Sequence, residues 1–104
     1  MAWIILTVAG ILEIGWAVGL KYSEGFTRPW PSAVTIATMV ASMYLLAVAV
    51  RTLPIGTAYA VWVGIGAAGT AVLGVYLFGE PASGPRVLGI LLIVAGVVLL
   101  KTGS

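Results

Sequence analysis

Long apolar runs separated by short polar segments form the main pattern along the chain. The separating segments contain proline and glycine, which are typical of turns. The pattern predicts helices over about residues 2–20, 32–50, 55–78 and 86–101. The first three have about the 20 residues that a helix needs to cross a bilayer, whereas the fourth is shorter, which favours association with a partner helix. We therefore predict an all-α membrane protein with four transmembrane helices in a single transmembrane domain, residues 1–104.

The composition excludes several classes of function. Hydrophobic residues make up 62% of the chain and charged residues only 8%, whereas about a quarter of residues are charged in soluble domains. The chain contains no cysteine and no histidine, so we expect no disulfide, no metal site, no cofactor and no enzymatic nucleophile–base pair. The five basic residues are scattered singly and form no patch that would bind nucleic acid.

Glu13 lies near the centre of the first predicted span, whereas Glu24 and Glu80 lie in predicted loops. A carboxylate at that depth is unfavourable unless it is protonated, paired or in contact with a wet cavity. No lysine or arginine lies at comparable depth in another span, so a binding role is favoured over an interhelical salt bridge or hydrogen bond. Desolvation disfavours the charged carboxylate and a bound cation favours it, so a proton and a cation compete for one site. That competition is the minimum chemistry of an antiporter.

Residues with room or chemistry for a ligand share the helical face of this acid. At about 100° per residue, that face contains Leu6, Ala9, Gly10, Trp16, Ala17 and Leu20. In the second span Ser42 offers a hydroxyl to the carboxylate or to a ligand, whereas Thr35 and Thr38 are equally well explained by bonds to their own helix. In the third span Tyr59 and Trp62 lie one turn apart and suit a cation through their ring faces.

Glycines in the third span have two interpretations. Gly64, Gly66 and Gly69 match the pattern GxGxxG, which in dinucleotide-binding proteins follows a β-strand. No strand is predicted here, so we interpret the glycines as positions of close helix packing. Gly66, Gly69 and Thr70 also continue the face of Tyr59 and Trp62.

Positive charges are nearly balanced between the two sides of the predicted four-span arrangement. One side carries Arg51 and Lys101, and the other carries Lys21, Arg28 and Arg86. Because lysine and arginine bias normally sets orientation, this small difference allows the same chain to insert both ways round.

Several stretches resemble the small multidrug resistance family over nearly the whole chain. They are Glu13 with Trp16 and Ala17, residues 20–28, residues 53–62 and residues 64–66. Trp16, Met39, Ser42 and residues 56–62 resemble the guanidinium exporter subtype of that family rather than the subtype that exports polyaromatic cations.

The resemblance implies an antiparallel, dual-topology homodimer in the plasma (inner) membrane of a prokaryote. Its two copies of Glu13 would exchange protons for guanidinium or a close relative. The resemblance also implies that the site is lined by Gly10, Trp16, Ser42, Tyr59 and Trp62. Gly89 and Gly96 resemble the dimerisation stretch of the family's fourth helix. A paired heterodimer, an exporter of quaternary ammonium or multidrug cations, and a structural membrane protein remain as alternatives.

Overall fold

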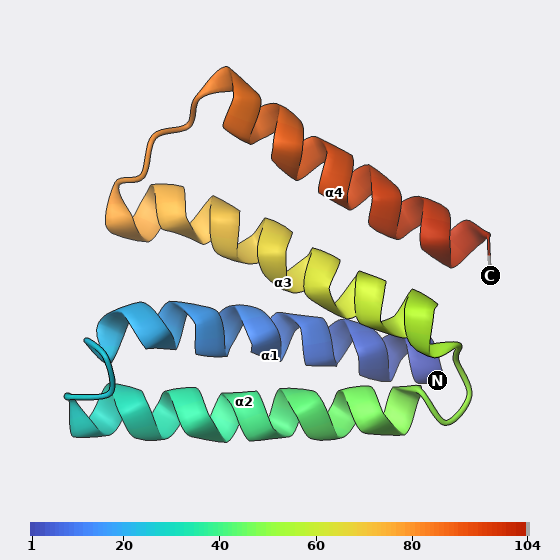
Figure 1. Ribbon diagram of the computed structural model, residues 1–104, viewed down its shortest axis with the longest axis horizontal. Coiled ribbons are helices and arrows are strands. Elements are labelled where there is room, and N and C mark those ends of the chain that lie inside the picture. Colours follow the sequence, from blue (N-terminus) through green and yellow to red (C-terminus); the bar gives the residue numbers. More distant parts are fainter. Residues whose placement is uncertain (104) are drawn as a thin grey trace.

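Four helices joined by short loops make up the computed structural model, which describes residues 1–103 (Figure 1). The helices are α1 (Ala2–Tyr22), α2 (Pro29–Ala49), α3 (Ile55–Phe78) and α4 (Gly84–Thr102). At about 1.5 Å per residue each is roughly 28–36 Å long, and all four are long and apolar enough to cross a membrane. The prediction of an all-α chain with four potential membrane-spanning helices is confirmed.

Two helices begin earlier than the hydropathy pattern predicts. α2 begins at Pro29 because a proline in the first turn loses no helical hydrogen bond, and Arg28 before it is extended, as a residue preceding proline prefers. α4 begins at Gly84 because Ser83 caps the helix by accepting a hydrogen bond from the backbone N–H of Arg86 at 3.4 Å. Hydropathy does not detect either start, since the first turns contain polar or turn-forming residues.

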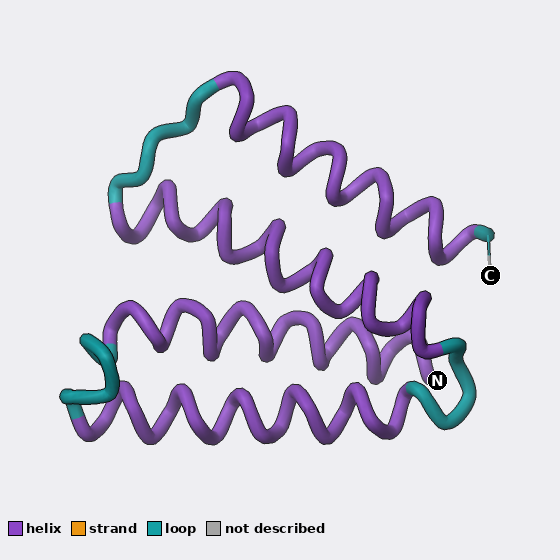
Figure 2. Tube along the Cα trace, in the orientation of Figure 1, coloured by secondary structure: helices purple, strands orange, loops and turns teal. Residues whose placement is uncertain are grey.

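α1 lies between α2 and α3, and α4 packs on the outer side of α3 (Figures 1 and 2). The α1–α2 and α3–α4 loops lie at one end of the molecule, which we call the loop end (Figure 2). The α2–α3 loop, the start of α1 and the end of α4 lie at the opposite end. Lys21, Arg28 and Arg86 are therefore at the loop end, and Arg51 and Lys101 at the other, as the four-span interpretation predicts.

Small residues bring the helices together. The core consists of Leu6, Ala9, Ala49, Ala58, Val61 and Trp62, contributed by α1, α2 and α3. A Cβ atom at Gly64 would overlap Val97 of α4, and one at Gly69 would overlap Ile14 of α1. These glycines therefore let α3 approach both neighbours closely. The interpretation of the GxGxxG pattern as helix packing is confirmed.

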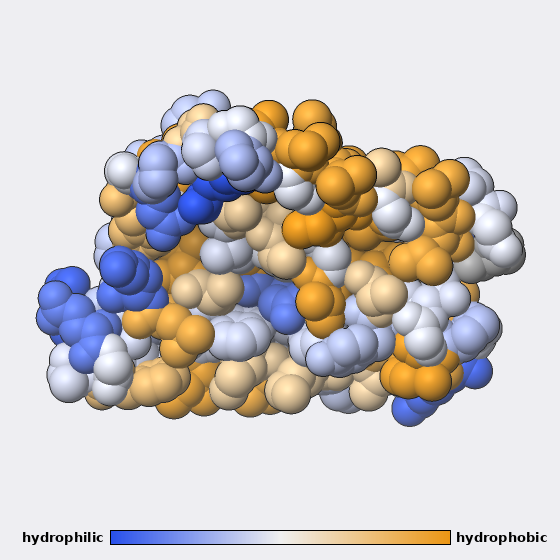
Figure 3. All heavy atoms as spheres, turned by 45° about the horizontal axis from the view of Figure 1, so that its top comes forward, coloured by the Kyte–Doolittle hydropathy of each residue, from blue (hydrophilic) through white to orange (hydrophobic). Residues whose placement is uncertain are grey.

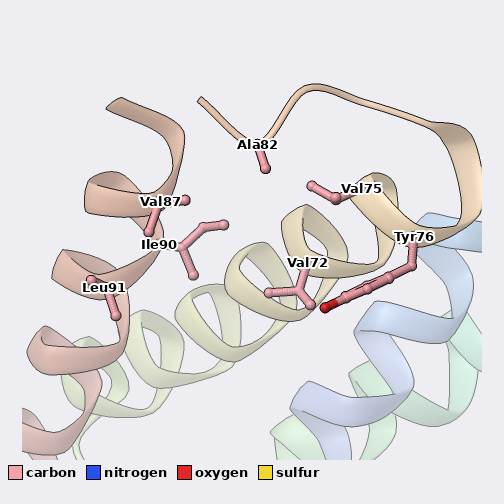
Figure 4. A pocket seen from close by; sticks show the side chains of 7 residues that line it. All are labelled: Val72, Val75, Tyr76, Ala82, Val87, Ile90 and Leu91. Atoms are coloured by element: carbon pink, nitrogen blue, oxygen red, sulfur yellow. The ribbon is translucent and has the colours of Figure 1, made fainter. Parts of the chain in front are cut away.

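α4 is the most exposed helix, and none of its described residues is buried. Gly89 and Gly96 face open space, because no atom lies within 4 Å of an added Cβ at either position. Apolar side chains extend along α4, and polar side chains gather at the loop end, with a smaller polar group at the opposite end of the molecule (Figure 3). A cavity of about 210 Å³ lies between the first turns of α4 and the last turns of α3 (Figure 4). It is lined by Val72, Val75, Tyr76, Ala82, Val87, Ile90 and Leu91. Lipid or another helix must cover this surface in a membrane.

Candidate functional site

Glu13 lies near the middle of α1 and is packed against α3. A Cβ atom at Gly66 would lie 2.7 Å from the carboxyl carbon of Glu13, so only a glycine leaves room for the acid there. The Oε2 atom of Glu13 is buried and has no hydrogen-bond partner among residues 1–103. An ion pair between Arg86 and Glu80, 2.6 Å apart, lies at the loop end instead. Glu13 is therefore an acid inside a membrane span, and one of its carboxylate oxygens has no hydrogen-bond partner in the described chain.

A buried hydrogen-bond chain connects three helices one turn before Glu13. The Ser42 hydroxyl of α2 donates to the carbonyl of Ala9 in α1 at 2.7 Å. It accepts a hydrogen bond from the indole N–H of Trp62 in α3 at 2.8 Å. The sequence interpretation offered the Ser42 hydroxyl to Glu13 or to a ligand. In the structure its proton is directed to Ala9, so within one chain Ser42 orients Trp62 rather than the carboxylate.

Two aromatic residues of the predicted site have exposed or unpartnered groups: the exposed ring of Tyr59, and the indole nitrogen of Trp16, which has no hydrogen-bond partner in the described chain. The Tyr59 ring lies 5.6 Å from the Trp62 ring, centroid to centroid, with planes inclined by 51°. Tyr59 is 54% exposed, whereas Trp62 is 7% exposed. The indole nitrogen of Trp16, one turn beyond Glu13, is buried and has no partner in the described chain. Tyr59 therefore offers an open ring face, and Trp16 a free N–H donor.

Gly10 is buried at the α1–α3 contact. A Cβ atom there would lie 2.8 Å from the Cβ of Ile65. Its place in the single chain is therefore a close helix approach one turn before Glu13 rather than the wall of an open cavity.

Gly66 and Thr70 of α3 lie near Glu13, although the sequence interpretation assigned neither residue a binding role. Gly66 contacts the Glu13 carboxylate, and the Thr70 hydroxyl one turn further along α3 is buried without a partner within residues 1–103. Their spacing of four residues put them on one helical face. The contact between Glu13 of α1 and this face of α3 depends on how the two helices pack, so neither helix alone could predict it.

Replacing Ser42 by alanine is expected to lower stability by about 1–2 kcal/mol, because the indole N–H of Trp62 and the carbonyl of Ala9 both lose a buried partner. Thermal unfolding in detergent micelles measures the effect. The matched control is Ser32→Ala, since the Ser32 hydroxyl bonds only to the carbonyl of Arg28 in its own turn. Equal effects of the two substitutions would contradict the proposed three-helix link.

The fold and this site define a small multi-pass membrane protein with an acid inside the bilayer. A family model described as Small Multidrug Resistance protein matches residues 1–93. The chain therefore belongs to the small multidrug resistance family. Together with its four membrane-spanning helices, this membership identifies it as a multi-pass protein of the bacterial inner membrane.

Similar proteins match the chain along its full length. A protein of Yersinia pseudotuberculosis serotype I named guanidinium exporter is 60% identical over 104 residues, which cover 100% of both chains. Proteins with the same name from Citrobacter freundii and Salmonella typhimurium strain LT2 are 58% and 59% identical, over 100% of this chain and 99% of theirs. These relatives are named as exporters and not as enzymes.

Proposed function

We propose that the protein exports guanidinium and small guanidinium-like cations in exchange for protons. The observation that carries this proposal is the unpartnered Glu13 carboxylate inside a membrane span. Full-length relatives at 60% identity that are named guanidinium exporters support the choice of cation. An enzymatic role has no support in the residues of the site.

The chemistry of exchange follows from the position of Glu13. A desolvated carboxylate is stable either as the neutral acid or beside a cation, so a proton and a guanidinium ion bind in alternation. Guanidinium is planar and presents N–H groups in a fork that matches the two oxygens of a carboxylate. Protons that enter from one side of the membrane displace the cation, and the cation displaces protons on the other. No cofactor takes part.

Aromatic residues of α1 and α3 supply the other groups of the proposed site. Ser42 holds the Trp62 ring through its indole N–H, and the tilted Tyr59 ring beside it is half exposed. Ring faces attract a cation through their electron density, whereas the free N–H of Trp16 suits a carboxylate oxygen. Gly10 and Gly66 act by leaving space for the neighbouring helix and for the acid.

An antiparallel homodimer is the assembly that we propose for this activity. The positive charges at the two ends are nearly balanced, which permits insertion in both orientations. α4 exposes apolar residues on most of its surface, and the open positions of Gly89 and Gly96 on one side of it suit close contact with a second helix. Two opposed chains would bring both copies of Glu13 to one cation.

Proton release on cation addition tests the proposed function. Weakly buffered, detergent-solubilised protein is mixed with guanidinium, tetrapropylammonium or a larger aromatic cation, and the pH change is recorded. Guanidinium is expected to release protons, and the bulky cations are expected to release few. Release by the bulky cations instead would indicate a multidrug exporter. If no cation released protons, Glu13 would be a structural residue that joins helices.

A further inference from the structure

Thr70 differs from three other threonines inside the membrane-spanning helices. Thr7, Thr35 and Thr38 each donate to the carbonyl four residues earlier in their own helix, at 2.7–2.9 Å. Such back-bonding satisfies a hydroxyl that cannot reach water. The Thr70 hydroxyl is buried, yet it forms no such bond and has no other partner in the part of the chain that the structure describes. This buried hydroxyl is therefore unsatisfied, which is a reason to look for a partner outside the described chain.

Thr70 lines a slot of about 420 Å³ between α1 and α3 near the loop end. The inner wall consists of small apolar residues, and the charged groups at the slot are Lys21, Glu80 and Arg86. The Lys21 ammonium lies 5.8 Å from the ring centre of Phe78 at the outer end. The volume exceeds many times the roughly 30 Å³ that one water molecule occupies. Room and polar partners for several water molecules are therefore present.

The slot begins one helical turn from Glu13. Its lining includes Ala17, four residues after Glu13, and Thr70, four residues after the Gly66 that contacts the Glu13 carboxylate. One turn is about 5.4 Å, so a water molecule that bound the Thr70 hydroxyl would lie about one turn from the acid, and one further water would span that gap. Both Glu13 Oε2 and the Thr70 hydroxyl lack partners within residues 1–103, and a buried water needs two to four of them.

The cavity on the opposite side of α3 differs in its chemistry. Between α3 and α4 the labelled side chains are aliphatic except for Tyr76 (Figure 4). No charged side chain is among the residues that line it. Its lining offers the Tyr76 hydroxyl and no charged group, fewer than the two to four polar partners that a buried water needs, so of the two cavities the α1–α3 slot is better suited to water.

We propose that the α1–α3 slot is hydrated and is the proton route between Glu13 and the loop-end membrane surface, with Thr70 as a positioning residue for water. The proposal rests on the proposed function. A hydronium ion in the slot breaks one O–H bond, the Glu13 carboxylate gains that proton, and neutral water remains. The reverse transfer deprotonates the acid. The Thr70 hydroxyl stays intact and only orients the water through hydrogen bonds.

Water access is tested with T70C, because the chain has no cysteine of its own. Thiols react with methanethiosulfonates as thiolates, which form in water and not in an apolar environment. The control is V72C, since Val72 lines the apolar cavity on the other side of α3. In protein reconstituted into liposomes, T70C is expected to react at least about tenfold faster than V72C. Equal or slower labelling of T70C would overturn the hydrated slot, whatever the transport activity.

The role of the hydroxyl is tested by two kinds of flux. T70V is expected to slow guanidinium uptake driven by a pH gradient by about tenfold, the effect of one lost hydrogen bond in a rate-limiting step. Exchange of labelled for unlabelled guanidinium at constant pH needs no proton movement, so it is expected to stay unchanged. T70S keeps the hydroxyl and is expected to retain both fluxes. T7V is the matched control, because Thr7 bonds to its own helix.

Each other outcome has a distinct meaning. If T70V slowed both fluxes equally, Thr70 would act in cation binding or folding, and the proton route would be refuted. If it slowed neither, the hydroxyl would have no role in positioning water. If the wild-type protein showed no uptake driven by pH, the proposed function itself would fail, and T70C labelling would still decide whether water enters the slot.

Discussion

Substituting Glu13 with glutamine is expected to reduce guanidinium uptake driven by a pH gradient at least about a hundredfold, the range expected when a group that must gain and lose a proton is removed. The amide has nearly the same shape as the acid, so it still fits against Gly66. However, it neither binds a proton in the physiological range nor carries the negative charge that attracts the cation. Radiolabelled guanidinium uptake into liposomes measures the loss.

Glu24→Gln is the matched control for this experiment, because it removes the same charge from an exposed position after α1. Its uptake is expected to stay close to that of the wild-type protein. Proton release on adding guanidinium should likewise disappear in Glu13→Gln and persist in Glu24→Gln. Uptake by Glu13→Gln at the wild-type rate would refute the assignment of Glu13 as the shared site of proton and cation.

Gly66→Ala is expected to weaken guanidinium binding by about tenfold or more. The added methyl group would lie 2.7 Å from the carboxyl carbon of Glu13 and closer still to Oε2, so the acid must move. Overpacking of a tight helix contact costs about 1–3 kcal/mol. The cation-bound state bears more of this cost than the free state because it needs the carboxylate in its original place, and a difference of about 1.4 kcal/mol corresponds to tenfold weaker binding. The midpoint of proton release in a guanidinium titration measures the change.

Gly56→Ala provides the control for Gly66→Ala, since no atom lies within 4 Å of a Cβ added at Gly56 in the first turn of the same helix. Alanine is the better helix former, so this variant is expected to keep wild-type affinity and to gain up to about 1 kcal/mol in stability. If Gly66→Ala bound guanidinium as tightly as Gly56→Ala, the contact between Gly66 and the Glu13 carboxylate would have no part in binding.

The membrane spans and the central acid follow from local properties of the chain. Hydropathy located all four helices because each span must satisfy its backbone hydrogen bonds internally and present apolar side chains to lipid. The same rule made Glu13 conspicuous, since an acid at that depth has few structural explanations. Helix starts were less predictable: the first turn of α2 contains Pro29, whose effect on the helix is local geometry rather than hydropathy.

The contacts of the site depend on which helix faces which. Periodicity put Ser42 and Trp62 on particular faces of α2 and α3, yet only the packing of both against α1 joined them to each other and to Ala9. The place of Gly66 against the acid and the unsatisfied hydroxyl of Thr70 likewise depend on how α1 and α3 approach. Hydropathy depends on single residues and their spacing, so the sequence of one helix is enough to predict that it spans the membrane. Which atoms meet across helices depends on the crossing and rotation of two helices, which close packing of small residues determines.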